Sequence, residues 1–339
     1  GGGLVMRIGE TILLDHPAYL QSAGAIVGQK EKEGPLGPYF AHVALNERFG
    51  TATFEQAESK MQAAALRLAL DKIGRSSDEV DLILAGDLLN QCVASAYGMR
   101  AAGRPFLGLY GACSTMAESA LLASLLVSTG VTDLTAAVTS SHFSGAERQF
   151  RQPLEYGGQR PPSAQWTVTA AGCLLFGKTP APLRVSAVRA GRIVDAGVRD
   201  MTNMGACMAP AAAATLAGFF RDTQTAPSDY SRIATGDLGF IGADLLTELL
   251  AREGYRLGEE YRDCGKMIFD REVQDVHSGG SGCGCSAAVL SCVLLPELAK
   301  TPKGKLLFCA TGALMSTLTS QQGESVPGIC HLVCFERGE

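Results

Sequence analysis

Basic residues are few and scattered in this chain, which has 29 lysines and arginines against 34 aspartates and glutamates in 339 residues. They form no basic stripe, and the net charge of −5 offers no attraction for a polyanion. We therefore expect no nucleic-acid partner. Charged residues make up only 19% of the chain and apolar residues 46%, a balance typical of a globular protein with a large core.

Apolar runs of the kind that cross a membrane are also lacking. The uncharged stretch over residues 201–220 is rich in Ala and Gly and contains Asn203 and Pro210, which makes it a poor membrane span. The first residues do not place a basic region before a long apolar block, so we expect no secretion signal. The sequence predicts an intracellular protein, soluble or peripheral to a membrane, without a transmembrane segment.

Metal-binding patterns are scarce even though the chain has 11 cysteines. Several of them, such as Cys173 and Cys309, lie in runs of Ala, Leu and Val, where a cysteine behaves as a small buried apolar residue in a reducing compartment. Cys283 and Cys285 form a close pair, but no second cysteine or histidine pair lies at short spacing. We predict neither a metal site nor a cofactor.

Cys113 lies between an extended apolar run, residues 105–110, and a run of small residues suited to a helix, residues 116–127. This order predicts a strand, a tight turn and a helix with the cysteine at the helix N-terminus. Unpaired backbone amides and the helix dipole favour a thiolate or an anionic ligand there. The Ser114 and Thr115 hydroxyls add hydrogen-bond donors. The site is suited either to acyl chemistry or to holding an acid.

A weak internal duplication indicates the architecture. Residues 81–88 and 230–238 are apolar strands that both end in Gly-Asp-Leu, and each follows a stretch with helical spacing. Each half also has a cysteine before a helical run and a threonine in the next strand, with the same spacing: Cys113 to Thr139 and Cys285 to Thr311.

Alternating strands and helices predict α/β units with parallel strands covered on both faces. We expect two pseudo-duplicated α/β halves, residues 1–180 and 181–339, packed into one layered body. The boundary falls in the proline-containing segment 178–182.

Polar residues that follow two of the predicted strands are candidates for the same site as Cys113, because ligands gather at the carboxyl ends of strands in open α/β sheets. They are Ser140, Ser141, His142, Asp87 and Asn90. The alternative for a lone histidine is a structural role. An aspartate is an awkward neighbour for an anion, so we expect Asp87 to orient loop amides or a histidine.

Two further groups are candidates for anion binding. Arg148 and Arg151 are able to pair with carboxylates, or they form solvated ion pairs with nearby glutamates. The glycine-rich segment Gly279, Gly280 and Ser281 resembles a nest of backbone amides that approaches a ligand closely, or it forms a tight turn.

Two α/β halves with a helix-opening cysteine in the first resemble the thiolase and ketoacyl-synthase superfamily. The sequence blocks are more similar to the family of stage V sporulation proteins AD from spore-forming Firmicutes, over nearly the whole chain. The blocks include residues 30–37 (KEKEGPLG), 84–91 (LAGDLLNQ), 111–115 (GACST), 146–151 (AERQFR) and 279–283 (GGSGC).

The resemblance implies a thiolase-like α-β-α-β-α body that binds dipicolinic acid, pyridine-2,6-dicarboxylate, for its uptake into the developing spore. It implies the other SpoVA proteins at the spore inner membrane as partners. It leaves open whether calcium accompanies the ligand and whether the chain forms the homodimer usual in the superfamily.

The resemblance also bears on catalysis. The superfamily typically supplies a histidine from a Gly-His-Pro motif or a His/Asn pair, whereas the corresponding loop, residues 278–283, contains no histidine. His277 and His331 lie outside that loop. We therefore expect a non-catalytic binding protein. The alternatives are an acyl-CoA or acyl-carrier thiolase or ketoacyl synthase with Cys113 as nucleophile, and a scaffold that only anchors partners.

Overall fold

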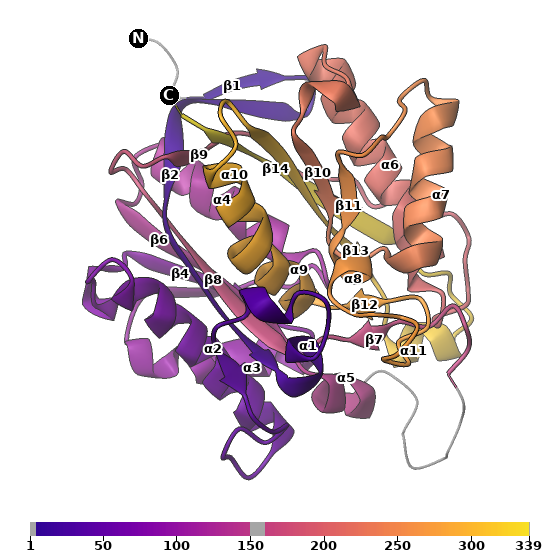
Figure 1. The fold of residues 1–339 in the computed structure, drawn as a ribbon, viewed down its shortest axis with the longest axis horizontal. Coiled ribbons are helices and arrows are strands. Elements are labelled where there is room, and N and C mark those ends of the chain that lie inside the picture. Colours follow the sequence, from indigo (N-terminus) through magenta and orange to yellow (C-terminus); the bar gives the residue numbers. More distant parts are fainter. Residues whose placement is uncertain (1–4, 150–159, 339) are drawn as a thin grey trace.

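The computed structural model describes residues 5–149 and 160–338, and in these residues one twelve-stranded sheet runs through the molecule (Figure 1). Ten of its strands follow a single path across the sheet, and β1 (Val5–Ile8) and β3 (Val43–Ala44) add to β2. The path is β11 (Tyr261–Asp263), β10 (Arg232–Thr235), β13 (Lys305–Ala313), β14 (Gly328–Arg337), β9 (Leu183–Arg189), β2 (Thr11–Gly28), β8 (Ala170–Gly177), β6 (Leu134–Ser141), β4 (Leu82–Gly86) and β5 (Phe106–Gly108).

The strand order repeats outward from the central β2–β9 pair. In the first half the order is β2, β8, β6, β4, β5, and in the second it is β9, β14, β13, β10, β11. Numbered within each half, both orders are first, fifth, fourth, second, third. The predicted duplication is therefore confirmed by topology. The chain passes from one half to the other between β8 and β9.

The sheet is mixed, so the expectation of parallel strands is correct only for the outer three strands of each half. β4 pairs in parallel with β5 and β6, and β10 pairs in parallel with β11 and β13. The strands between them, β8, β2, β9 and β14, pair antiparallel. The physical reason is the connection. A parallel neighbour needs a crossover that carries the chain back along the sheet, whereas the connection from β13 through α11 returns to the same end of the sheet, where Gly328 of β14 pairs with Ala313 of β13.

Helices form three layers around the two halves of the sheet (Figure 1). Helices α2 and α3 cover the outer side of the first half and α6 and α7 that of the second, while α4, α9 and α10 lie between the halves. Their bounds are α2 (Phe54–Asp71), α3 (Val93–Met99), α4 (Thr115–Ser128), α6 (Met204–Thr223), α7 (Gly239–Arg252), α9 (Cys283–Val289) and α10 (Leu295–Ala299). The body is thus the α-β-α-β-α arrangement of the thiolase-like fold.

Smaller elements complete the described chain and bring loops to the middle of the molecule. They are α1 (Gln29–Lys32), α5 (Phe143–Gln149), α8 (Cys264–Met267), α11 (Thr317–Gln321) and the short parallel pair β7 (Trp166–Thr167) and β12 (Gly280–Ser281). Among the described residues, no helix has the length and apolar character needed to cross a membrane.

Helix α4 holds the two halves together because it contacts β2, β4 and β6 on one side and β13 and β14 on the other. A helix between two sheets has to be apolar all round. Ala117, Ala120 and Ala123 are fully buried along it, and their small side chains allow the sheets to approach. The N-terminus of α4, which follows Cys113, is therefore placed where the two halves meet.

Candidate functional site

Cys113 lies in a tight turn whose polar groups are satisfied within the turn itself. Ala112 has a left-handed φ of 50°, which is costly for a residue with a side chain. The Ser114 hydroxyl donates to the carbonyl of Gly111, and the Thr115 hydroxyl donates to the carbonyl of Ala112. These hydroxyl hydrogens therefore hold the strained turn and do not point to a ligand.

The second half presses directly on this turn. A Cβ atom on Gly312, in β13, would lie 2.5 Å from the carbonyl oxygen of Gly111 and 3.1 Å from the amide nitrogen of Ser114. Only glycine leaves room for that approach. The end of β13 therefore positions Cys113 against residues of the second half.

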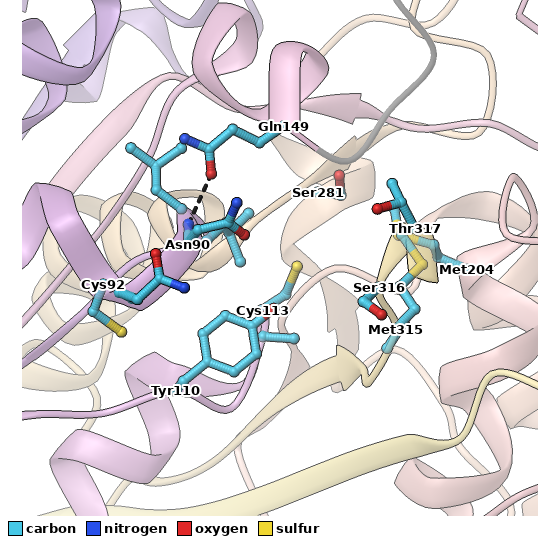
Figure 2. Close-up of a pocket in the computed structure, with 15 residues that line it drawn as sticks. Asn90, Cys92, Tyr110, Cys113, Gln149, Met204, Ser281, Met315, Ser316 and Thr317 are labelled. Carbon is cyan, nitrogen blue, oxygen red and sulfur yellow. Dashed lines mark hydrogen bonds between the residues drawn. The ribbon is translucent and has the colours of Figure 1, made fainter. Parts of the chain in front are cut away.

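A cavity of about 320 Å³ opens in front of Cys113, with walls from both halves (Figure 2). Amide, hydroxyl, thiol and apolar groups line it, and its 15 lining residues include no charged side chain and no histidine. The first half contributes Leu88, Leu89, Asn90, Gln91, Cys92, Tyr110, Ala112, Cys113 and Gln149, and the second half contributes Met204, Ser281, Ala313, Met315, Ser316 and Thr317.

One wall is a strained loop held by Asp87. Gln91 and Cys92 have left-handed φ values of 57° and 52°. Fully buried Asp87 accepts hydrogen bonds from the amides of Leu89 (3.0 Å) and Ser95 (2.9 Å) and from the Ser95 hydroxyl (2.5 Å). Asp87 thus orients loop amides, one of the two roles expected for it, and it does not line the cavity.

The same loop is also tied to helix α5. The backbone amide of Asn90 donates to Gln149 Oε1 at 2.7 Å, so Asn90 and Gln149 stand together on one side of Cys113 (Figure 2). Met204, Met315, Ser316 and Thr317 stand on the other side.

Asp237 lies behind the Cys113 wall. It follows β10, is fully buried, and is hydrogen-bonded by the Cys113 thiol. Its Oδ1 accepts from the Thr311 hydroxyl at 2.7 Å and its Oδ2 from the amide of Gly282 at 2.9 Å. Burial raises the pKa of Asp237 to about 7, against these hydrogen bonds, which lower it. The carboxyl in contact with the cysteine therefore keeps its proton to a higher pH than an ordinary aspartate.

Sequence reasoning treated Asp237 only as the repeat of Asp87. Its contact with Cys113 was missed, as were Tyr110 and Gln149. The usable signal was the second Gly-Asp-Leu at the end of a strand, because strand ends of both halves meet at the site.

Of the candidates, Cys113, Asn90 and Ser281 line the cavity. Ser114 is in the turn, and the other strand-end residues point elsewhere. The Ser140 hydroxyl donates to Glu58 at 2.8 Å, and the Ser141 hydroxyl donates to the carbonyl of Val168 at 2.6 Å.

His142 and the remaining candidates also lie outside the cavity. The His142 ring meets the carbonyl of Glu47 at 2.8 Å through Nε2. Gly279 forms a turn with a φ of 103°, and Gly280 pairs with Trp166 in the β12–β7 pair. Arg148 is exposed and lies 3.9 Å from Glu55. Arg151 lies outside the described residues.

The positions of the histidines show whether one of them can act as a base for Cys113. All five lie within the described residues, and none lines the cavity. His277 lies against the carbonyl of Pro161 and the carboxylate of Asp275, and His331 accepts from the amide of Gly191. A histidine base for Cys113 is therefore not in place in this arrangement.

Two repeated α/β halves with a cysteine turn at their junction define a thiolase-fold protein, and solved structures agree. The chain is similar to the tetronic acid condensing enzyme AbyA1 (15% identity, TM-score 0.60, 94% of this chain and 99% of that one). It is similar to a variant of OleA from Xanthomonas campestris (12%, TM-score 0.61, 98% and 100%). It is also similar to 3-oxoacyl-[acyl-carrier-protein] synthase III from Aquifex aeolicus (12%, TM-score 0.55, 93% and 99%).

The family is narrower than the fold. The family model for stage V sporulation protein AD (SpoVAD) matches residues 9–336. Stage V sporulation protein AD of Bacillus subtilis (strain 168) is 41% identical over 328 residues, which cover 97% of each chain. The chain belongs to the SpoVAD family of sporulation proteins.

The loop wall provides a first test. We expect Asp87→Asn to loosen residues 88–95, because an amide accepts with one oxygen where the carboxylate accepts with two. Each lost hydrogen bond to the buried group costs about 1–3 kcal/mol. Amide hydrogen exchange should rise in this segment, and urea unfolding should show a lower free energy of unfolding. Ser95→Ala, which removes one of the three donors, should give a smaller change, and unchanged exchange in both variants would contradict the assignment.

Proposed function

We propose that this protein binds dipicolinic acid in the Cys113 cavity, as a peripheral component of the SpoVA apparatus in the developing spore. The observation that carries the proposal is the cavity itself. It lies between the halves beside the N-terminus of α4, and it is lined by polar groups without the histidine that acyl transfer requires.

The lining suits a small, flat acid. Leu88, Leu89, Met204 and Met315 offer apolar surface to an aromatic ring. Amide and hydroxyl side chains surround them, and hydrogen bonds from such groups to a carboxylate contribute about 1.5–3 kcal/mol each. Because the carbonyl oxygen of Gln149 accepts from the loop, its amide nitrogen is the group left to meet a carboxylate.

The alternative function is acyl transfer from an acyl-CoA or acyl-carrier thioester through Cys113. It is favoured by one observation, a cysteine in a strained turn at a helix N-terminus in the fold of the condensing enzymes named above. The step needs a base for the thiol, and the buried Asp237 is the group in contact with it.

Further proposals concern a metal that binds with the ligand and the protein partners of the chain. We propose no resident cofactor, with calcium entering only together with dipicolinate. We propose that the other SpoVA proteins hold the chain at the spore inner membrane.

Calorimetric titration with dipicolinate tests the binding function. We expect saturable binding to the wild type, weaker binding of picolinate because it has one carboxylate fewer, and about 10- to 100-fold weaker dipicolinate binding to Asn90→Ala. Asn46→Ala, at an exposed position outside the cavity, is the matched control and should bind as the wild type. Parallel titrations with calcium chloride show whether the acid enters with the metal. Wild-type protein without saturable heat in either condition would refute the proposal.

Mass spectrometry after incubation with acetyl-CoA tests the alternative. We expect no persistent acetyl adduct, because no histidine lines the cavity to take the thiol proton. An adduct on the wild type that disappears in Cys113→Ala would instead support acyl transfer.

We also propose that a second copy of the chain pairs with the free edge of β5. This strand ends the sheet path among the described residues, and Leu107 in it is 53% exposed. Sedimentation should show twice the chain mass of 35.5 kDa, and Leu107→Glu should reduce it to one chain. Leu45→Glu, at a more exposed leucine away from β5, should remain dimeric. A wild type that sediments as a single chain would refute the pairing.

A further inference from the structure

We propose that Asp237 controls the access of anions to the Cys113 cavity through its protonation: the cavity accepts an anion while Asp237 is neutral and opposes it once Asp237 is ionised. The inference rests on the proposed function for the identity of the natural ligand. It adds that, above pH 7, a proton is taken up when that ligand binds. It concerns a residue that does not line the cavity and acts through the cysteine that does.

Only the side chain of Cys113 separates Asp237 from a ligand in the cavity. Its carboxyl group accepts a hydrogen bond from the Cys113 thiol, and Cys113 lines the cavity. The amide that donates to Asp237 belongs to Gly282, next to the cavity residue Ser281. A negative charge in the cavity therefore faces Asp237 across the thiol of Cys113, with no water layer required between them.

The described residues that donate hydrogen bonds to the Asp237 side chain supply no positive charge to offset its ionisation. From β13 it meets the Thr311 hydroxyl, from the loop before α9 the Gly282 amide, and from the turn before α4 the Cys113 thiol. In the described part of the chain, these donors to its side chain are all uncharged. The amide of Gln165 donates to its backbone carbonyl at 2.8 Å.

Among the residues that the structure describes, the other titratable groups that face Asp237 are acidic or neutral. They are Asp263 at the end of β11, Cys264 on α8, and Cys283 and Cys285 on α9. Burial raises the pKa of each of these three thiols well above the ordinary value, so they stay neutral. Asp263 accepts from the amides of Leu238, Gly239 and Lys266, and burial raises its pKa to about 6. Above that pH its charge further opposes ionisation of Asp237.

The sign of the pH dependence follows. Asp237, with a pKa of about 7, is neutral at lower pH and ionised at higher pH. An anion in the cavity repels only the ionised form, so it binds with full affinity below pH 7. Above pH 7 it has to bring a proton with it, and its affinity then falls by up to about tenfold per pH unit.

Alkylation of Cys113 tests the proposal with two probes that differ in charge. Iodoacetate is an anion across pH 5.5–9 and iodoacetamide is neutral, so the ratio of their rates removes the reactivity of the thiol itself. Peptide mapping by mass spectrometry separates Cys113 from the half-buried Cys92 and Cys292. In the wild type we expect the iodoacetate-to-iodoacetamide ratio to fall at least about threefold as the pH rises through 7.

Two variants locate the titrating group. Asp237→Asn keeps the shape and removes the charge, and the ratio should no longer depend on pH. Thr311→Val keeps the carboxyl but removes a hydrogen bond to its ionised form, and the midpoint should move to higher pH; this variant decides the matter if Asp237→Asn does not fold. A flat ratio in the wild type, the same fall in Asp237→Asn, or an unmoved midpoint in Thr311→Val would overturn the proposal.

Dipicolinate titrations at pH 6 and pH 8.5 separate this inference from the function it rests on. We expect weaker binding at pH 8.5 in the wild type and equal binding at both pH values in Asp237→Asn. Binding that is equally strong at both pH values in the wild type would overturn the role of Asp237 and leave the binding function intact. No binding at pH 6 together with the expected alkylation ratios would refute dipicolinate as the ligand and support the role of Asp237.

Discussion

The approach of β13 to the Cys113 turn is the contact on which the site depends. Gly312 leaves room for the carbonyl of Gly111, and the small residues of α4 allow the two halves of the sheet to close on one helix. This closure brings Thr311 and Asp237 of the second half to a cysteine of the first. A side chain at Gly312 would separate these groups. The site therefore depends on close backbone contact between the two halves.

The contrast with the condensing enzymes is electrostatic. A thiol that attacks a thioester needs a base and donors for the developing oxyanion. Here a buried carboxyl with a raised pKa lies beside the thiol, and the described residues that line the cavity carry no charge. An acyl-transfer step at this thiol would have to use that carboxyl as its base.

Much of the architecture was predictable because it follows from local sequence patterns. The helix after Cys113, the strands before Asp87 and Asp237, and the repeat itself follow from apolar spacing and turn residues. The antiparallel middle of the sheet was not predictable, because a connection that returns to the same end of the sheet can also contain a helix, as α11 does between β13 and β14, and then resembles a crossover in the sequence. The direction of a side chain at a strand end was equally hidden. His142 follows β6 as expected, yet its ring contacts the loop at Glu47 and lies outside the cavity.

Asp87 and Asp237 show why identical local sequence does not determine a role. Both end a strand in Gly-Asp-Leu, and both are fully buried. Asp87 accepts from two amides and a hydroxyl of its own loop, so it holds a wall in place. Asp237 accepts from one amide, one hydroxyl and the thiol, each from a different part of the chain. The duplication supplied two equivalent carboxyls, and the neighbours of each, assembled only when the halves close, made one structural and placed the other behind the cysteine.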